Sequence, residues 1–337
     1  MWASENMANN GHEVSLISAR GSAAAEGGRR LPSNLEIIET IEPSWEGNLA
    51  EEAHYLRYKE LLENEYGGGD GIVWDNTWHC FSYLSAKKFP NMKIIHTHHG
   101  IVEWQKVPAK EIRFPRFIGL SKLHAEYISS VLKIPVRYVH HGIPLPGIEE
   151  TRSNKNGDYL LSVNRIIREK GIEDSIDIAL RTNNLIKIAG DDIHVPDLSY
   201  VEMIREKCKN TSGLAQYFGL VDNKTKIELI KNCKAIIACP KPTWIEAFGL
   251  YALEANAYGK PVLALANGGL NDIIVNQTNG FLAKTPEELQ GYVDRVYECS
   301  PESCRQRVKN LFTVEKMSKN YLEVFERVMD DDHCFKW

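Results

Sequence analysis

The chain has 337 residues, of which 43% are hydrophobic and 25% are charged, and its formal net charge is −5. This length suits two domains of ordinary size, and the mildly acidic balance gives no sign of a nucleic-acid-binding protein. No apolar run approaches the roughly 18 residues that a membrane-spanning helix needs, and the polar start of the chain does not resemble a signal peptide.

The cysteines indicate a reducing compartment. Their number is odd, none forms a C-x-x-C pair, and a chain of this size does not need disulfide bonds to hold its core together. We therefore expect reduced thiols and a cytoplasmic protein. The seven positions are 80, 208, 233, 239, 299, 304 and 334.

The first half alternates short β-branched runs with helical stretches. It opens with what reads as the end of a helix and a turn at Asn10–Gly11. An open α/β domain usually places a strand and a loop before such a helix, so we expect the first strand of this domain to be missing from the sequence. Strands are predicted at 13–18, 35–39, 71–74, 93–96, 117–120 and 136–140, and helices at 49–64, 82–87 and 122–132.

A polar, turn-rich segment at 146–159 is the best linker, and alternation restarts after it. The pattern predicts an α/β protein with two Rossmann-like domains, 1–148 and 149–312, whose parallel sheets face each other across a cleft. An amphipathic helix and a tail follow at 313–337. In the second half, strands are predicted at 159–163, 185–189, 215–218, 235–238 and 261–264, and helices at 172–182, 199–207, 223–232, 249–258, 286–297 and 315–327.

The segment PTWIEAFGLYALEA, at 242–255, places two glutamates around a helix start. Glu246 lies in the loop after a buried strand, Gly249 begins a helix, and Glu254 is about one turn inside it. The free N–H groups of a helix start attract phosphate, and carboxylates accept hydrogen bonds from sugar hydroxyls. The arrangement predicts a nucleoside-diphosphate site. The alternative is that both glutamates are ordinary solvated acids on the surface, because the sequence pattern would then be the same.

A second feature is LSVNRIIREKG, at 161–171. Arg165 and Lys170 follow the end of a strand, where cations would neutralise phosphate charge. Arg168 could serve equally, and basic residues at a helix start are often only solvated.

Together these segments resemble the retaining glycosyltransferases of the GT-B fold, family four. The first resembles that family's Glu-x7-Glu signature, and NRIIREKG resembles its Gly-Arg-x4-Lys-Gly, with Asn164 in place of the glycine. The resemblance continues, in the family's usual order, through IAGDD at 188–192, YFG at 217–219, GKPVLALANGGLNDII from 259 and TNGFL at 278–282.

The resemblance implies a role for each matching residue. Glu246 would contact the donor sugar near the reacting centre, and Glu254 would hold the ribose hydroxyls. Arg165 and Lys170 would bind the diphosphate and stabilise the departing charge. Backbone N–H groups for the sugar and diphosphate would come from Phe248, Gly249 and Leu250. We expect no cofactor and no metal, and a UDP- or GDP-linked donor is favoured.

The first half matches the family less closely. IIHTHHGI, at 94–101, resembles its Thr-x-His element, which would send His99 into the cleft toward the donor sugar and the acceptor. A metal site at His96, His98 and His99, or a merely structural histidine, are the alternatives. VHHGIPL, at 139–145, resembles Pro-Asn-Gly-Val-Asp but carries His141 and Pro144 in place of Asn and Asp.

The function implied is transfer of a sugar from a nucleoside-diphosphate sugar to a hydroxyl acceptor, with polysaccharide biosynthesis as the expected setting. Two other functions stay open: a nucleotide-sugar epimerase, and a non-catalytic nucleotide-sugar-binding protein. The sequence does not give the base, the sugar, the acceptor or the oligomeric state. The acceptor could be a glycan, a lipid or a small molecule, and a lipid would bring a peripheral membrane contact. The resemblance places the helix near residue 320 against the domain interface.

Overall fold

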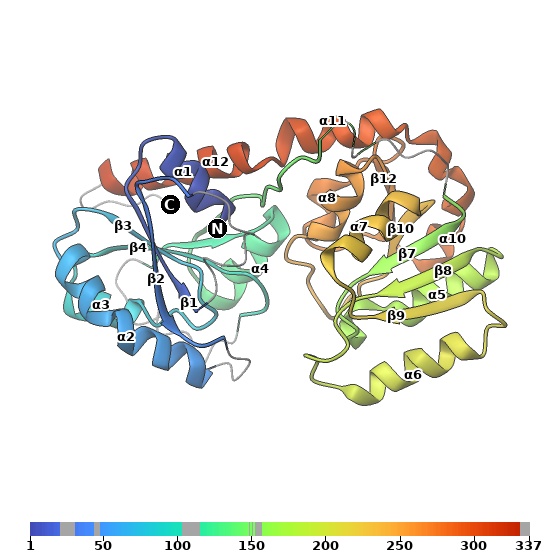
Figure 1. Ribbon diagram of the computed structural model, residues 1–337, viewed down its shortest axis with the longest axis horizontal. Coiled ribbons are helices and arrows are strands. Elements are labelled where there is room, and N and C mark those ends of the chain that lie inside the picture. The colour runs from blue at the N-terminus through green and yellow to red at the C-terminus, as the bar shows by residue number, and fades with distance from the viewer. Residues whose placement is uncertain are drawn as a thin grey trace. The chain divides into compact units, whose positions relative to one another are not determined.

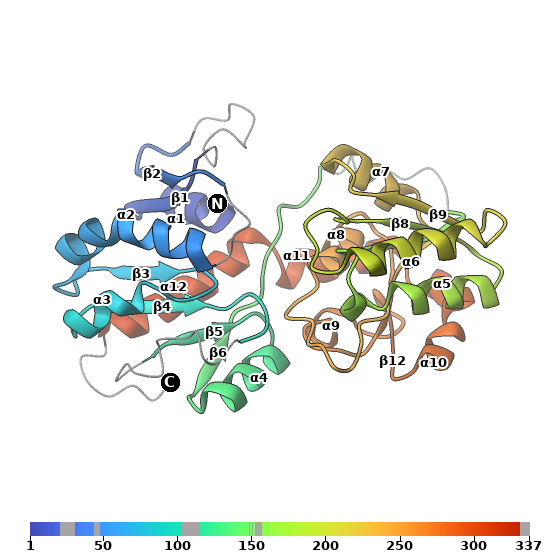
Figure 2. The same ribbon diagram turned by 90° about the horizontal axis from the view of Figure 1, so that it is seen from below.

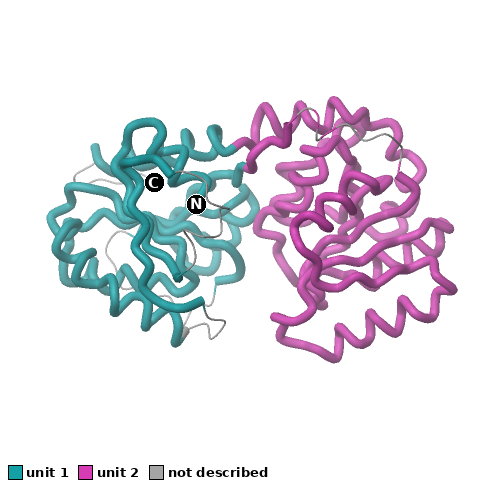
Figure 3. Tube along the Cα trace, viewed as in Figure 1, with its two compact units in different colours: residues 1–142, 314–337 teal, residues 143–313 magenta. Residues whose placement is uncertain are grey.

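A computed structural model describes residues 1–20, 31–43, 48–102, 115–147, 149, 151 and 157–330. The chain divides into two compact units, shown in Figure 3: unit 1 comprises residues 1–142 and 314–337, and unit 2 comprises residues 143–313. The sequence places boundaries after 148 and 312, whereas the units divide after 142 and 313. Cys334 and the rest of the tail lie outside the described residues.

Unit 2 is built on a parallel sheet of six strands in the order β12-β11-β10-β7-β8-β9. The order reverses between β7 and β10, so the connections leave in opposite directions at this point of the sheet, and a crevice forms there at the carboxyl ends. Figure 1 shows the strands running side by side. Their bounds are β7 Tyr159–Val163, β8 Leu185–Ala189, β9 Ala215–Gly219, β10 Ala235–Ala238, β11 Val262–Leu265 and β12 Gly280–Ala283.

Helices cover the sheet of unit 2. All four residues of β10 are buried, as expected of a central parallel strand with both faces covered. Side-chain caps fix several helix starts; Asp197, for example, accepts hydrogen bonds from the N–H groups of Ser199 and Tyr200. The helices are α5 Ile172–Arg181, α6 Leu198–Lys209, α7 Asn223–Asn232, α8 Leu250–Ala257, α9 Leu270–Ile273, α10 Pro286–Gln290 and α11 Pro301–Leu311.

Several features of unit 2 differ from the sequence prediction, which did not include helices α9 and α11. The helix predicted at 286–297 breaks at Gly291 into α10 and a 3₁₀ turn, Val293–Glu298. Strand β12 was not predicted as a strand, because its four residues give too short an apolar run and the turn at Asn279–Gly280 dominates the local pattern. The other predicted strands of this unit are confirmed to within a residue at each end.

Unit 1 contains two parallel sheets instead of one. β1 pairs with β2, and a separate sheet has the order β3-β4-β5-β6. Among the described residues, β1 and β3 each lack a strand partner along one edge. Their residues are mostly half-buried, whereas those of β4 are mostly buried. The bounds are β1 Val14–Ala19, β2 Leu35–Ile41, β3 Ile72–Asp75, β4 Lys93–Thr97, β5 Phe117–Gly119 and β6 Val136–Tyr138.

The carboxyl-terminal helix α12, Val314–Asp330, belongs to unit 1, and Figure 2 shows it beside α1 and β4. Its buried Tyr321 contacts Trp74 at 4.3 Å between ring centroids, and the Tyr321 hydroxyl lies 3.0 Å from Thr97 Oγ1. The apolar spacing in the sequence therefore marks a core-facing helix. The other helices of this unit are α1 Trp2–Asn9, α2 Asn48–Tyr66, α3 Tyr83–Lys88 and α4 Lys122–Leu132.

No helix in the described ranges combines the length and the apolar character that crossing a membrane requires.

The edge of β1 predicts a contrast in amide hydrogen exchange. The Val14 N–H donates to Asn34 O, on the β2 side, so by alternation the N–H of Ser15 and Ile17 point to the other edge. We expect the Ile17 amide to exchange at least about tenfold faster than that of Leu16, because it lacks a strand partner. In β4, which is paired on both sides, neighbouring amides should be protected alike.

Site-resolved hydrogen exchange by NMR measures this contrast. Equal protection of Ser15, Leu16 and Ile17 would contradict it and would mean that another segment covers this edge of β1.

Candidate functional site

A cavity of about 280 Å³ lies in unit 2 at the carboxyl ends of β7, β8 and β9. Ligands of open parallel sheets bind at this edge, so the cavity is the candidate site. Two of the predicted donor-binding residues, Arg165 and Glu254, line it. The full lining is Val163, Asn164, Arg165, Gly190, Asp191, Leu220, Val221, Lys226, Tyr251 and Glu254.

The loops after β7 and β8 meet through a glycine. Gly190 has φ +151°, and a Cβ at this position would lie 1.6 Å from the Asn164 carbonyl oxygen. Any larger residue would therefore push the two loops apart. The contact holds Arg165, which directly follows Asn164, at the rim of the cavity.

Arg165 is an exposed cation without a counter-ion in the part of the chain that the structure describes. Its side chain makes no hydrogen bond or ion pair there, and it faces the cavity lining that also contains Glu254. Guanidinium groups bind phosphate through several parallel N–H donors. An unpaired guanidinium in a cavity is therefore suited to an anionic ligand.

Arg168, the alternative cation, is occupied elsewhere. Its Nε donates to Asp197 Oδ2 at 2.8 Å, and its guanidinium carbon lies 5.0 Å from the centre of the Tyr200 ring. Of the two arginines, only Arg165 lines the cavity.

Glu254 points into the cavity from α8. The helix begins at Leu250, so Glu254 is one turn inside it, as predicted. Lys226, from α7, donates to Glu254 Oε1 at 2.7 Å, and both side chains are about one-quarter exposed (26% and 29%). The other carboxylate oxygen, Oε2, has no hydrogen-bond partner among the described residues. Lys226 thus orients the carboxylate while one oxygen stays available.

The start of α8 carries the Phe248–Gly249–Leu250 segment. Gly249 has φ +103°, and a Cβ there would lie 2.8 Å from Leu270 Cδ2, so the position requires glycine. No side chain of the described residues caps this helix start. The Phe248 side chain is buried, with its ring centroid 6.0 Å from that of Phe312, and Phe248 is not among the residues that line the cavity.

Lys170 and Glu246 form one ion pair, with 2.5 Å between Lys170 Nζ and Glu246 Oε2. Both side chains are about nine-tenths buried, at 11% and 10% exposure. Lys170 ends a 3₁₀ turn after β7, and Glu246 lies in the loop after β10. The Tyr251 hydroxyl lies 3.5 Å from the same Glu246 oxygen. The family resemblance implied separate roles for the two residues, and the structure brings them into direct contact.

Three residues of this site were missed in the sequence. Lys226 and Tyr251 have no distinctive spacing, and their contacts with Glu254 and Glu246 depend on the packing of α7 and α8. Asn267 stood inside a matched motif but received no role. Its Oδ1 accepts from the Glu246 N–H at 2.8 Å, and its Nδ2 donates to Trp244 O at 2.9 Å.

In unit 1, His99 lies just beyond the carboxyl end of β4. Its Nε2 is 3.1 Å from Asn76 Oδ1, and its ring stacks on that of His141, with centroids 5.5 Å apart. Burial, with a smaller contribution from nearby His141, lowers the pKa of His99 to about 3. His99 is therefore uncharged at neutral pH. The sequence analysis did not predict this stacking. It noted that His141 replaces the family's Asn, but nothing in the pattern connected His141 to His99.

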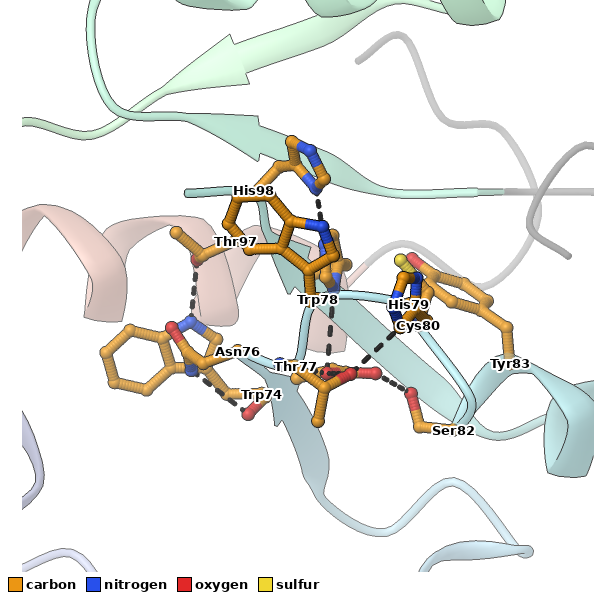
Figure 4. Close-up of polar contacts among 12 residues, drawn as sticks. Trp74, Asn76, Thr77, Trp78, His79, Cys80, Ser82, Tyr83, Thr97 and His98 are labelled. Carbon is orange, nitrogen blue, oxygen red and sulfur yellow. Dashed lines mark hydrogen bonds and ion pairs between the residues drawn. The ribbon is translucent and has the colours of Figure 1, made fainter. Parts of the chain in front are cut away.

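The other two histidines of the IIHTHHGI segment, His96 and His98, have different partners from His99. His96 Nε2 lies 3.2 Å from His98 Nδ1, and His96 Nδ1 lies 3.6 Å from the buried carboxylate of Asp75 (Figure 4). His96 and His98 are thus structural residues, whereas His99 bonds to Asn76. The described residues contain no cluster of three or more histidines, cysteines or acids that could hold a metal ion.

Comparison with known proteins identifies the second half of the chain. Residues 148–312 match the family model described as glycosyl transferases group 1. A Klebsiella pneumoniae protein, named only as an uncharacterized 41.2 kDa protein in cps region, is 23% identical over 268 residues, which cover 74% of this chain and 70% of that protein.

Two solved structures share the fold. A glycosyltransferase from Rickettsia africae superposes with a TM-score of 0.74 at 18% identity, covering 98% of this chain and 94% of its own. HepE of Anabaena, in complex with UDP, superposes with a TM-score of 0.70 at 14% identity, covering 94% and 100%. It has also been solved with UDP-glucose.

These likenesses confirm the expected GT-B fold of two Rossmann-like domains. Residues 148–312 therefore resemble the glycosyl transferases group 1 family, and the whole chain shares the GT-B fold.

Proposed function

We propose that the protein is a retaining, metal-independent glycosyltransferase that uses a nucleoside-diphosphate sugar as donor and a hydroxyl group as acceptor. One observation carries the donor assignment: the cavity of unit 2 contains both the unpaired guanidinium of Arg165 and the carboxylate of Glu254. A nucleoside diphosphate offers phosphate oxygens to the cation and ribose hydroxyls to the carboxylate.

The proposed leaving-group site consists of Arg165, Lys170 and the start of α8. Departure of the nucleoside diphosphate leaves negative charge on the phosphate oxygen that was bonded to the sugar. Two cations and uncapped backbone N–H groups stabilise such charge without a metal ion. Because Lys170 is already paired with Glu246, a bound diphosphate would draw Lys170 toward it and leave Glu246 for the donor sugar.

The proposed chemistry is a front-face substitution. The acceptor oxygen forms a bond to the anomeric carbon on the face from which the phosphate oxygen departs, and the carbon–phosphate-oxygen bond breaks. The acceptor proton passes to the departing phosphate oxygen. Arg165 and Lys170 hold the phosphate through this step, and the configuration of the anomeric carbon is kept.

The nucleotide of the donor, the biosynthetic role and the cellular compartment are inferred from the relatives and from the cysteines. The relation to HepE, solved with UDP and UDP-glucose, favours a UDP-linked donor over the GDP-linked alternative. The Klebsiella relative named from a cps region agrees with a place in polysaccharide biosynthesis. The six described cysteines are all buried and unpaired, which favours a reducing compartment such as the cytoplasm.

Nucleotide binding tests the donor site. We expect UDP to bind, and Glu254→Ala to weaken binding about 10- to 100-fold, because the ribose loses hydrogen bonds to a charged group. Arg165→Ala should weaken UDP more than uridine, since it removes a phosphate contact. Isothermal titration calorimetry with UDP, GDP, ADP and uridine measures all of these.

Arg168→Ala is the matched control, because Arg168 is three residues away and bonds to Asp197 instead of lining the cavity. UDP affinity should not change in this variant. If no nucleotide binds the unaltered protein, or if Arg168→Ala weakens UDP as much as Arg165→Ala, the assignment is wrong.

Turnover tests the role of Lys170. In Lys170→Ala we expect kcat to fall by about two to three orders of magnitude, since one stabilising contact to the leaving group is lost. The change also leaves Glu246 buried without its cation, so thermal unfolding should be followed in parallel. Release of UDP from UDP-sugars in the presence of candidate acceptors gives the rate.

Lys207→Ala controls for the loss of an ion pair, because Lys207 pairs with Asp177 at 2.6 Å on α6 and α5, away from the cavity. Its turnover should stay normal. Near-normal kcat in a folded Lys170→Ala protein would exclude the proposed role.

The stereochemistry of the product tests retention. With an α-linked donor we expect an α-linked product, because bond formation and departure share one face. Proton NMR of the anomeric signal at early reaction times distinguishes the anomers. A β-linked product would require an inverting mechanism, and binding without any transfer would favour a non-catalytic nucleotide-sugar-binding protein.

A further inference from the structure

Asn76 and His99 meet at the carboxyl edge of the larger sheet of unit 1. β3 and β4 are parallel neighbours, with Asp75 opposite His96 in the register. Asn76 directly follows β3, and His99 follows β4 by two residues. The two side chains are joined by the 3.1 Å contact between Asn76 Oδ1 and His99 Nε2.

The orientation of the Asn76 side-chain amide is fixed by the hydrogen bond that its nitrogen, Nδ2, donates. Asn76 Nδ2 donates to the Trp74 carbonyl oxygen at 3.3 Å, as Figure 4 shows, so Oδ1 is the atom that faces His99. An amide oxygen only accepts hydrogen bonds. His99 Nε2 must therefore carry the proton. In a neutral imidazole the remaining nitrogen, Nδ1, then holds a lone pair.

The loop that carries Asn76 is held from two sides. The buried Asp75 accepts from the Thr77 N–H and the Thr77 hydroxyl, each at 2.7 Å, and from the Ser82 hydroxyl (Figure 4). Glu51, from α2, accepts from the Trp78 N–H at 2.5 Å. The loop therefore cannot turn Asn76 away from His99 without breaking several hydrogen bonds at once.

Asp75 also lies against β4, the strand that ends two residues before His99. His96 bonds to His98 and lies next to the Asp75 carboxylate. On the next turn of the chain, His124 Nε2 lies 2.8 Å from the Gly100 carbonyl oxygen. The residues on both sides of His99 are thus fixed, and the ring itself is placed between Asn76 and His141.

We propose that Asn76 is a positioning residue that holds His99 as the neutral Nε2–H tautomer, so that His99 Nδ1 accepts a hydrogen bond from a substrate hydroxyl. Among the described residues, Nδ1 has no hydrogen-bond partner, which leaves it for a ligand. The role of the hydroxyl rests on the proposed function, because the donor sugar and the acceptor both carry such groups; the tautomer itself does not depend on that function.

The proposal also limits what His99 does. A histidine whose protonated form is strongly disfavoured is a poor proton acceptor at neutral pH. Burial of the ring disfavours its charged form most, and the positive charges that His141, His96, His98 and His124 would carry disfavour it further. His99 then orients a hydroxyl instead of removing its proton.

The tautomer is tested by nitrogen NMR of protein labelled with ¹⁵N-histidine, with His99→Gln to assign the signal. Between pH 5 and 8 we expect His99 to stay uncharged with the proton on Nε2. In Asn76→Ala the single tautomer should be lost, and in Asn76→Asp the new carboxylate should raise the pKa of His99 into the observable range. An Nδ1–H tautomer or a charged ring in the unaltered protein would overturn the proposal.

Asn91→Ala is the matched control, because Asn91 is an exposed asparagine just before the opposite end of the same strand, β4. It should leave the His99 signals unchanged. If Asn91→Ala shifts the tautomer as much as Asn76→Ala, the effect is structural and the assignment to Asn76 fails.

Kinetics tests the link to substrate. In Asn76→Ala we expect KM for one hydroxyl-bearing substrate to rise about threefold to tenfold, the effect of one lost hydrogen bond, with a smaller change in kcat. A rise confined to the donor assigns the hydroxyl to the donor sugar, and a rise confined to the acceptor assigns it there. Unchanged KM for both, with the tautomer lost, would overturn the positioning role. Failure to bind any nucleotide sugar would instead contradict the proposed function and leave the NMR result standing.

Discussion

The geometry of the candidate donor site depends on the close packing of two loops in unit 2. The loop after β11 carries Gly268, at φ +48°, where a Cβ would lie 1.9 Å from the Glu246 carbonyl oxygen. Gly269 is equally restricted, because its Cβ would lie 2.4 Å from Phe248 Cα. The Gly269 N–H donates to Glu246 O at 2.8 Å. These contacts fix the backbone on which Glu246 and the start of α8 stand, and they require glycine.

The ion pair between Lys170 and Glu246 depends on this backbone, because the glycine contacts fix the position of Glu246. Burying two charges costs several kcal/mol each, and their attraction repays this only with good geometry. A buried pair is therefore weak evidence for stability alone. Here the pair lies beside an uncapped helix start, and the Tyr251 hydroxyl lies near the same carboxylate. Stability is thus a poor reason for the pair, whereas two charged groups held ready for a charged ligand explain its position.

Much of the fold could be predicted from the sequence, because parallel strands buried on both faces leave clear apolar runs between helices. The position of Glu254 one turn inside α8 followed from Gly249 and the helix-forming residues after it. The pair between Lys170 and Glu246 did not, since 75 residues separate them and only the strand order brings their loops together. The choice between Arg165 and Arg168 likewise depended on Asp197, which no local pattern connects to either arginine.

The polar side chains at the carboxyl ends of the strands differ in charge between the two units. The edge of unit 2 carries charged groups, with Arg165 unpaired among the described residues and Lys226 beside Glu254. At the histidine edge of unit 1, burial disfavours protonation of both His99 and His141. A diphosphate binds to cations such as the guanidinium of unit 2, whereas a neutral histidine of fixed direction can accept a hydrogen bond from a hydroxyl group. A charged His99 would donate from both nitrogens and could no longer accept from a hydroxyl, so its neutrality matters as much as its position.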